Sequence, residues 1–394
     1  MSPLPSPPVP ADARALIDDL RARFPRVAVV HDWLTIPGGS EDVVLELLEL
    51  FPHAELFTSV YDPRPWPPQI TERPVHASFL NRVPGAVSNY PKLLPLMNRA
   101  FESFDLSGFD LVLSSSHANA KNVHTPPSTL HVCYCHTPMR YAWEPEFLAG
   151  EEIGRATRLM LPPLLGYLRR KDLAGASRPD VFVANSAYVA ARIRRFYGRE
   201  AHVVHAPVDV DHYLQIERRA GGAGDDDGFY LVFGRVVPYK RVDLAIAGGA
   251  LAGRAVKVAG GGRGLEAVRA QAGPNAELLG RVSDDERDAL LGSARALLFP
   301  GEEDFGIVPV EAQAAGLPVI AYGVGGARET VRDGVTGVLF DAQTPEAVAA
   351  AIARFEALSL DPTAPRENAR GFGRGRFRAE MAAVIAQAGG VPAS

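Results

Sequence analysis

Two glutamates, Glu303 and Glu311, are separated by seven residues and flank a sequence that predicts the start of a short helix. The helix is expected to begin at Gly306, because Pro309 is tolerated only in the first turn of a helix. The first N–H groups of a helix are unpaired and carry a partial positive charge, so they suit a phosphate. Two carboxylates beside such a helix end suit a ligand with a phosphate in its middle and hydroxyls at both ends. The alternative is a surface helix that carries ordinary acidic residues.

Two cations, Arg235 and Lys240, follow a predicted strand at residues 229–234. Both are expected to project from the loop at the carboxyl end of that strand. Two fixed cations there can neutralise a diphosphate and stabilise it as it leaves. The alternative is that both are solvated surface charges.

The elements that position such residues are indicated by apolar runs. Residues 27–31 (VAVVH) form a continuous run, typical of a strand buried in a parallel sheet. The run leads to Gly38 and Gly39, and Ser40 is expected to cap a helix that continues to about residue 50. Adjacent glycines between a buried strand and a helix permit close approach of the backbone to a ligand, and a plain tight turn is the alternative.

Histidines end two further apolar runs, at His117 and at His136. Ligands of open α/β sheets bind outside the carboxyl ends of the strands, so we expect both histidines near a ligand. Arg140 and Tyr141 follow closely, and Arg140 is a candidate for binding a phosphate. The alternatives are a structural role for His117 and an ion pair between Arg140 and a local carboxylate.

Residues 303–311 (EDFGIVPVE) resemble the E-x7-E signature of the retaining GT-B glycosyltransferases of family 4. In that family the first glutamate contacts the hydroxyls of the donor sugar and the second binds the ribose hydroxyls of the nucleotide. The resemblance implies these roles for the two glutamates. The family has the same cationic pair at the spacing of Arg235 and Lys240, and its histidine that holds the donor sugar resembles His117. The implied catalytic residues are therefore Arg235, Lys240, Glu303 and His117.

The resemblance also implies further residues that bind the donor. The glycine loop of the family, which faces the donor diphosphate, resembles Gly38 and Gly39. The loop whose backbone meets the nucleobase resembles the segment around Arg281 and Val282. In the acidic loop and the following helix, the implied donor-binding residues are Phe305, Gly306, Ile307, Val308 and Glu311.

The chemistry that the resemblance implies is sugar transfer with retention of anomeric configuration. The acceptor hydroxyl attacks the face that the diphosphate leaves, and the leaving phosphate helps to take its proton. No metal or other cofactor is expected, because Arg235, Lys240 and the helix amides supply the positive charge. The acceptor side is implied for His136, Arg140 and Tyr141.

The implied fold is α/β of the GT-B type, with two Rossmann-like doubly wound domains that face each other across a cleft. We expect an acceptor-side domain at residues 1–206 and a nucleotide-sugar domain at residues 207–371. Residues 372–394 are expected to form a helix that returns to the first domain. The length of 394 residues agrees with two domains, because it exceeds one comfortable core.

Composition excludes several classes of protein. The net charge of −5 and the pI near 6.1 provide no basic excess to hold nucleic acid. Cys133 and Cys135 would face opposite sides of a strand, so we expect no disulfide between them and a reducing, cytoplasmic location. The first residues show no signal-peptide pattern, and no apolar run reaches spanning length.

Three other patterns carry alternatives. Residues 90–101 form an apolar, basic helix that could make a peripheral contact at the inner face of a membrane, although packing on its own sheet is favoured. The glycine run at residues 260–264 lacks the third glycine of a dinucleotide loop, which argues against a dehydrogenase. Asp209 with Asp211, and residues 225–227, fit a D-x-D metal pattern that we do not favour.

Residues 114–121 (SSSHANAK) and 134–143 (YCHTPMRYAW) resemble bacterial mannosyltransferases of polysaccharide assembly. They favour GDP-mannose as the nucleotide-sugar co-substrate and a glycan or a lipid-linked molecule as the acceptor. One alternative is a GT-B sugar-nucleotide 2-epimerase, which needs no acceptor. The other is a non-catalytic sugar-binding protein.

Overall fold

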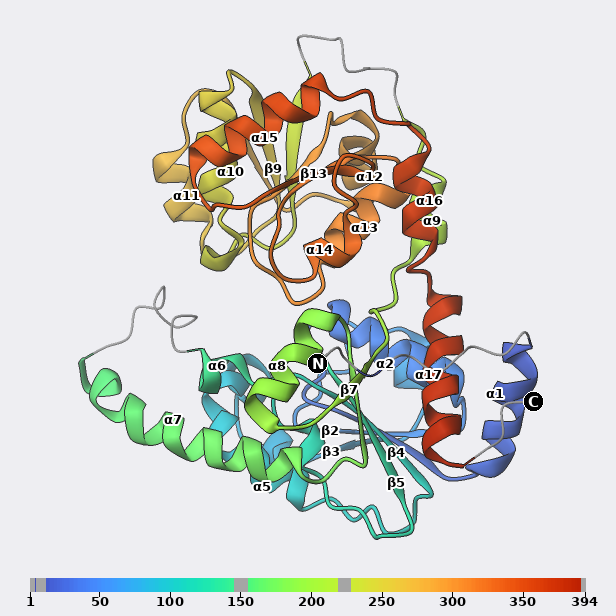
Figure 1. Ribbon diagram of the computed structural model, residues 1–394. Coiled ribbons are helices and arrows are strands. Elements are labelled where there is room, and N and C mark those ends of the chain that lie inside the picture. The colour runs from blue at the N-terminus through green and yellow to red at the C-terminus, as the bar shows by residue number, and fades with distance from the viewer. Residues whose placement is uncertain (1–3, 5–11, 145–154, 219–227, 391–394) are drawn as a thin grey trace. The chain divides into compact units, whose positions relative to one another are not determined.

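The computed structural model describes residue 4 and residues 12–144, 155–218 and 228–390 of the chain. The chain divides into two compact domains (Figure 1). The first contains Met1–Pro207 and Gly375–Ser394, and the second contains Val208–Arg374. The sequence predicts divisions after residues 206 and 371, and the structure divides after Pro207 and Arg374.

In the described part of the first domain, seven parallel strands form a sheet with the order β3-β2-β1-β4-β5-β6-β7. The order reverses between β1 and β4, which are hydrogen-bonded neighbours. Such a switch point is where open α/β sheets bind ligands, outside the carboxyl ends of the strands. The strands are β1 (Val27–His31), β2 (Glu55–Thr58), β3 (Val75–Ala77), β4 (Leu111–Ser116), β5 (Leu130–Cys135), β6 (Val181–Ala184) and β7 (Ala201–Val203).

Helix α17 (Arg374–Ala388) packs in the core of the first domain, beside α1 in Figure 1. Its residues Phe377 and Met381 share one buried cluster with Leu16 and Leu20 of α1. The predicted return of the last helix to the first domain is therefore confirmed. The other helices of this domain are α1 (Ala13–Arg23), α2 (Gly39–Leu50), α3 (Pro68–Thr71), α4 (Ala86–Asn89), α5 (Leu94–Glu102), α6 (Arg140–Trp143), α7 (Arg155–Ala176) and α8 (Ala187–Tyr197), with the short 3₁₀ helices η1 (Phe79–Arg82), η2 (Tyr90–Leu93) and η3 (Ala120–Asn122).

The second domain repeats this architecture in its described residues, with six parallel strands in the order β10-β9-β8-β11-β12-β13. Its switch point lies between β8 and β11. The strands are β8 (Phe229–Phe233), β9 (Ala255–Ala259), β10 (Ala276–Gly280), β11 (Leu297–Phe299), β12 (Val319–Tyr322) and β13 (Gly337–Phe340). The helices are α9 (Val210–Leu214), η5 (Pro238–Lys240), α10 (Val242–Leu251), α11 (Leu265–Gln271), α12 (Asp284–Ser293), α13 (Ile307–Ala314), α14 (Ala327–Thr330), α15 (Pro345–Ala357) and α16 (Ala364–Arg370).

The two parallel sheets confirm the α/β class and the two doubly wound domains.

The structure also gives the glycine run after β9 a packing role. A Cβ atom on Gly260 would lie 1.8 Å from the carbonyl oxygen of Gly234, and one on Gly262 would lie 2.3 Å from that of Val236. Glycine is required here because two backbone segments touch.

Residues 90–101 form η2 and α5, and their apolar side packs on the sheet of their own domain. Met97, Ala100 and Phe101 are fully buried there, whereas Leu96 is half exposed. The favoured packing of this segment is therefore confirmed. None of the helices in the described residues is both long enough and apolar enough to cross a membrane.

Strand β5 buries several polar or reactive groups. Cys133 and Cys135 are both buried and free, so the prediction that they form no disulfide is confirmed. His131 on the same strand is fully buried, and its Nε2 lies 2.8 Å from the hydroxyl of Ser114. Burial, with a smaller effect from the charge of Arg178, lowers the pKa of His131 to about 3.

We expect the first domain to lose stability as the pH falls below about 6.5, in part because of His131. The unfolded chain then binds a proton at this residue, whereas the folded chain does not until about pH 3. The loss is about 1.4 kcal/mol per pH unit for one such histidine. Replacing His131 by Asn should reduce the loss between pH 6 and pH 5 by about that amount.

Urea unfolding followed by tryptophan fluorescence measures this effect, because the three tryptophans, Trp33, Trp66 and Trp143, all lie in the first domain. The matched control is His124→Asn, which changes an exposed histidine of the same domain. An unchanged pH slope in His131→Asn would contradict the prediction.

Candidate functional site

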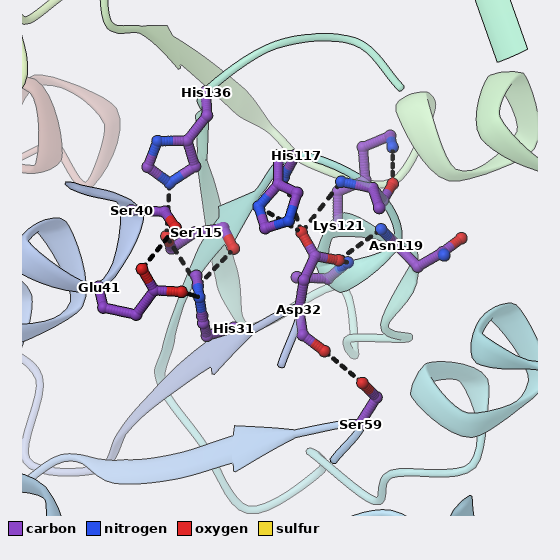
Figure 2. Close-up of polar contacts among 12 residues, drawn as sticks. His31, Asp32, Ser40, Glu41, Ser59, Ser115, His117, Asn119, Lys121 and His136 are labelled. Atoms are coloured by element: carbon purple, nitrogen blue, oxygen red, sulfur yellow. Dashed lines mark hydrogen bonds and ion pairs between the residues drawn. The ribbon is translucent and has the colours of Figure 1, made fainter. Parts of the chain in front are cut away.

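The carboxyl ends of β1, β4 and β5 bring three histidines together at the edge of the first sheet (Figure 2). The ring centroid of His117 lies 6.0 Å from that of His31 and 6.1 Å from that of His136. The sequence predicts His117 and His136 near a ligand, and the structure places them side by side. It also adds His31. In the sequence, His31 ends an apolar run, and this position does not indicate a chemical role.

Asp32, immediately after β1, organises this edge. Its fully buried carboxylate accepts hydrogen bonds from the backbone N–H groups of four successive residues. The donor distances are 2.7 Å for His117, 2.9 Å for Ala118, 2.5 Å for Asn119 and 2.7 Å for Ala120. Burial alone raises the pKa of Asp32, but the histidine charges and these amides outweigh it, so its pKa lies below the usual value. An ionised Asp32 therefore holds the turn that carries His117.

His117 is held on two further sides. Its Nδ1 lies 3.3 Å from Oδ2 of Asp32, and the ring meets Trp33 edge-on at 4.4 Å between centroids. Burial lowers the pKa of His117, although Asp32 acts in the opposite direction. The side chain keeps 22% of its surface exposed, so it remains accessible to a ligand.

Lys121 lies four residues after His117 but does not face a ligand. Its fully buried ammonium donates to Asp172 at 2.5 Å and to the carbonyl oxygen of Ala118 at 2.6 Å. The second carboxylate oxygen of Asp172 accepts from Trp143 at 2.6 Å and from Tyr197 at 2.8 Å. This buried ion pair therefore stabilises the turn that follows His117.

We expect Asp172→Ala to lower the free energy of unfolding of the first domain by about 3–5 kcal/mol, because it leaves the Lys121 ammonium buried without a counter-ion. Tryptophan fluorescence in urea measures the change. The double variant Asp172→Leu with Lys121→Met should recover most of the loss, since it removes both charges. A single variant as stable as the wild type would show that Lys121 reaches water.

Two of the residues expected on the acceptor side, Arg140 and Tyr141, lie in α6, and the third, His136, follows β5. The Nε atom of Arg140 lies 4.0 Å from the carboxylate of Glu144, which also pairs with Arg192 at 2.9 Å. Arg140 therefore faces a local carboxylate, as the alternative interpretation holds, but shares it with a second cation. Tyr141 is 39% exposed. An acceptor role for these residues stays a prediction.

The glycine pair at the start of α2 differs from the expectation. The helix begins at Gly39 with Gly38 as its N-cap, so the predicted cap at Ser40 is wrong. The Ser40 hydroxyl instead donates to the buried carboxylate of Glu41 at 2.8 Å. A Cβ atom on Gly38 would lie 3.2 Å from that carboxylate. Gly38 therefore leaves room for Glu41 to turn back toward the edge of the sheet.

The edge of the second sheet brings together the cations and the acidic loop. Nζ of Lys240 lies 2.7 Å from Oε1 of Glu303, and the charge of Arg235 is close enough to oppose that of Lys240. Burial lowers the pKa of Lys240, but Glu303 outweighs burial, so the pKa is raised and the ammonium is charged. A Cβ on Gly234 would meet Nζ of Lys240 at 3.6 Å and Val308 at 3.8 Å.

Helix α13 begins as predicted, with Gly306 as its N-cap. The φ angle of Gly306 is +85°, which a residue with a side chain rarely adopts. Gly306 has no side chain that could cap the helix, and the first amides of a helix suit an anion. Phe305 is buried and its ring lies 5.9 Å from that of Phe372, so only the backbone of Phe305 can reach a ligand.

Glu311 on α13 is held by Tyr213 of α9. The Tyr213 hydroxyl donates to the Glu311 carboxylate, and burial together with this charge raises the pKa of Tyr213. The sequence predicts Glu311 as the ribose ligand but does not indicate Tyr213. Tyr213 is a partner that fixes where the carboxylate points.

A second glycine loop supports the acidic loop from behind. The N–H of Gly326 donates to the carbonyl oxygen of Glu303 at 2.9 Å. A Cβ on Gly326 would lie 2.3 Å from Cα of Phe305, and one on Gly325 would lie 2.3 Å from the Glu303 carbonyl oxygen. The acidic loop is therefore held at backbone contact distance by residues 325–326.

We expect Gly326→Ala to displace the acidic loop and to weaken binding of the donor that the sequence predicts at Glu303. The added methyl group cannot fit at 2.3 Å from a backbone atom, so the loop must move. Calorimetric titration with a nucleoside diphosphate sugar should show an affinity at least tenfold lower, or about 1.4 kcal/mol. Gly375→Ala is the control, because a Cβ there meets nothing within 4 Å.

The remaining predicted positions are those of the nucleobase loop and the two D-x-D patterns. Arg281 is exposed, and a Cβ on Gly261 would lie 3.1 Å from its Cγ atom, while Val282 is half-buried. Asp209 pairs with Arg374 at 3.3 Å, which gives its carboxylate a structural partner. The second D-x-D pattern, residues 225–227, lies outside the described residues.

Comparison with known families matches both domains. Residues 37–212 match the model described as Glycosyltransferase Family 4, and residues 215–372 match the model described as Glycosyl transferases group 1. One similar curated protein is the D-inositol 3-phosphate glycosyltransferase of Geodermatophilus obscurus, 38% identical over 211 residues, which are 46% of this chain and 47% of that protein. The protein of that name from Mycobacterium tuberculosis is 34% identical over 179 residues, 41% of this chain and 37% of its own length. The matches therefore span less than half of these relatives.

Solved structures show the same fold at low identity. Sucrose-phosphate synthase from Thermosynechococcus elongatus has a TM-score of 0.65 and 19% identity, over 93% of this chain and 100% of that one. The lipopolysaccharide outer core galactosyltransferase WaaB in its apo form has a TM-score of 0.62 and 16% identity, over 92% and 99%. At these identities the likeness establishes the fold alone, which is GT-B.

Proposed function

We propose that this chain, a member of the family 4 glycosyltransferases with the GT-B fold, transfers a hexose from a nucleoside diphosphate sugar to an acceptor hydroxyl. One observation carries the proposal. Lys240 and Glu303 lie 2.7 Å apart beside the uncapped start of α13, with Arg235 close to Lys240. A cation, a carboxylate and free amides are the groups that a sugar joined to a diphosphate requires.

The second domain would hold the donor. Arg235, Lys240 and the first amides of α13 neutralise the diphosphate, and their positive charge stabilises it as it leaves. Glu303 accepts hydrogen bonds from sugar hydroxyls. Glu311, oriented by Tyr213, accepts those of the ribose. When the phosphate arrives, Lys240 exchanges part of its contact with Glu303 for the ligand, and Glu303 is released toward the sugar.

Transfer would proceed with retention of configuration. The bond from the anomeric carbon to the diphosphate oxygen breaks, and the acceptor oxygen forms its bond on the same face. The leaving phosphate takes the proton of the acceptor hydroxyl, so no protein base is assigned. Arg235 and Lys240 supply the positive charge that a metal ion supplies in other glycosyltransferases. Metal independence is therefore part of the proposal, and activity should persist in EDTA.

The donor is proposed from a resemblance between sequence motifs, and the acceptor belongs to the same proposal. GDP-mannose is favoured by the resemblance of residues 114–121 and 134–143 to mannosyltransferases of polysaccharide assembly. A glycan or lipid-linked acceptor, a cytoplasmic location at the inner face of a membrane and the acceptor role of Arg140 belong to the same proposal. The curated relatives are named for a phosphorylated acceptor, D-inositol 3-phosphate, which suits a cation at Arg140.

Two variants test the site. Lys240→Ala and Glu303→Ala should each lower kcat/KM for sugar transfer by about 100-fold or more, because each removes a charge that faces the reacting group. Lys257→Ala is the matched control. Lys257 lies on β9 of the same domain, and its Nζ lies 3.0 Å from the carboxylate of Glu277. Full turnover in both site variants would overturn the assignment.

A donor screen tests the nucleotide. GDP-mannose at about 100 times its dissociation constant should stabilise the protein by about 2.7 kcal/mol, more than UDP-glucose or ADP-glucose at the same concentration. Thermal unfolding with a dye measures the shift. A larger stabilisation by the UDP sugar would show that GDP-mannose is the wrong donor. A product assay without acceptor distinguishes a 2-epimerase, which would convert UDP-N-acetylglucosamine alone, and binding without turnover would indicate a sugar-binding protein.

A further inference from the structure

Helix α9 and the residues that follow it pack against α13 and the end of α12 in the second domain (Figure 1). The guanidinium of Arg218, four residues after α9, donates to the carbonyl oxygens of Leu291 at 2.7 Å and of Ala294 at 2.8 Å, where α12 ends. Helix α13 carries Glu311. The segment around α9 is therefore fixed to one helix and lies beside the other, which bears the carboxylate assigned to the ribose.

Tyr213 is the residue of α9 that reaches Glu311. The side chain of Tyr213 is buried, and its hydroxyl donates to the Glu311 carboxylate. Burial, followed by the charge of Glu311, raises the pKa of Tyr213, so the hydroxyl keeps its hydrogen. One hydroxyl supplies one hydrogen, whereas a carboxylate has about four acceptor positions. Tyr213 thus holds the carboxylate and leaves acceptor positions for the hydroxyls of a ligand.

Arg287 of α12 holds the ring of Tyr213. Its Cζ atom lies 5.2 Å from the centroid of that ring, within the range of a cation–π contact. Two carboxylates fix the guanidinium there, with Nη1 2.7 Å from Oδ1 of Asp284 and Nη2 2.8 Å from Oδ1 of Asp288. Nε2 of His212 lies 3.0 Å from the same guanidinium. The ring cannot turn without losing the contact with Arg287, so α12 sets the direction of the Tyr213 hydroxyl.

The same domain contains a second tyrosine with the same kinds of partner, near the first residue of β8. The hydroxyl of Tyr230 donates to Glu356 at 2.8 Å, and Cζ of Arg295 lies 5.9 Å from the centroid of its ring. Both oxygens of Glu356 also accept from Arg254, at 2.8 and 2.9 Å. Ligands of parallel sheets bind at the carboxyl ends of the strands, and Tyr230 lies at the opposite end. It is therefore a structural counterpart of Tyr213 away from the proposed donor site.

We propose that Tyr213 and Arg287 are positioning residues for the ribose of the nucleotide. Arg287 fixes the ring of Tyr213, and the Tyr213 hydroxyl fixes the carboxylate of Glu311 in the direction that accepts hydrogen bonds from the ribose. A carboxylate held in this way loses a partner when the 2′-hydroxyl is missing, so the domain selects ribonucleotides over 2′-deoxyribonucleotides. The inference rests on the proposed function, because the ribose role of Glu311 belongs to that proposal.

Tyr213→Phe tests the hydrogen bond, because it removes only the hydroxyl. Calorimetric titration of the full chain with GDP and 2′-deoxy-GDP, and in parallel with UDP and 2′-deoxy-UDP, measures the ratio of the two affinities. We expect the wild type to prefer the ribonucleotide at least tenfold, and Tyr213→Phe to reduce this preference about 3- to 10-fold. Tyr230→Phe is the matched control and should keep the wild-type ratio. A wild-type ratio in Tyr213→Phe would overturn the inference.

The affinity ratio is a readout that a merely structural role would not move. A general disturbance of the domain weakens both nucleotides alike and leaves their ratio unchanged. Lys240→Ala provides this reference, because the lysine is proposed to contact the diphosphate, which both nucleotides share. Its affinities should fall for both members of a pair, at an unchanged ratio. A change in ratio as large as that of Tyr213→Phe would show that the ratio does not report on the ribose.

A double-mutant cycle tests whether Arg287 acts through Tyr213. Arg287→Gln should reduce the preference for the ribonucleotide about threefold in the wild type and have no further effect in Tyr213→Phe, where the hydroxyl is already absent. Arg287→Lys keeps a cation and should retain more of the preference than Arg287→Gln. Equal effects of Arg287→Gln in both backgrounds would contradict a role through Tyr213. If the Arg287 variants do not fold, Tyr213→Phe still decides.

The titrations also separate this inference from the proposed function. If the wild type binds no nucleoside diphosphate, the proposed function is wrong and the inference is wrong with it. If the wild type binds ribonucleotides and 2′-deoxyribonucleotides equally, the inference alone is wrong, and the proposed diphosphate site at Lys240 is unaffected.

Discussion

The carboxylate of Asp32 determines the shape of the functional edge of the first domain. It is fully buried and ionised, and such a charge is tolerated only when hydrogen bonds replace the water it loses. The four N–H groups of residues 117–120 provide them, and this requirement pulls the end of β4 into a turn around the end of β1. His117 is placed by its backbone before its side chain makes any contact. The buried Lys121–Asp172 pair supports the same turn from the other side.

The second domain positions its site mainly through close backbone contact. Gly301 allows the turn that carries Lys240 to approach, since a Cβ there would lie 2.7 Å from Cα of Lys240. Gly325 and Gly326 hold the loop of Glu303 in the same way. These backbone contacts fix the segments that carry Lys240 and Glu303, whose side chains then meet at 2.7 Å between Nζ and Oε1. A site built this way is organised before a ligand arrives, which lowers the cost of binding.

The two edges use buried charge differently. In the first domain, burial lowers the pKa of His117 and of His136, which lie near the carboxylates of Asp32 and Glu41. In the second domain, Lys240 stays charged and acts through its field. A charged lysine in such a place suits a diphosphate. This difference between the two edges follows from the residues that surround each titratable group.

Much of the fold is determined by the sequence alone. Continuous apolar runs such as residues 27–31 predict buried parallel strands, and Gly306 with Pro309 predicts the start of α13, because these signals are local. The sequence also identifies four candidate site residues, because each follows the end of a predicted strand: Glu303, Lys240, His117 and His136. Only the tertiary structure decides the parts played by Asp32, Glu41 and Tyr213. Asp32 and His117 are 85 residues apart, and Oε1 of Glu41 lies 3.2 Å from Nε2 of His31, which is on another element. Burial and partners across such separations set the ionisation of these groups, and no local pattern of residues encodes it.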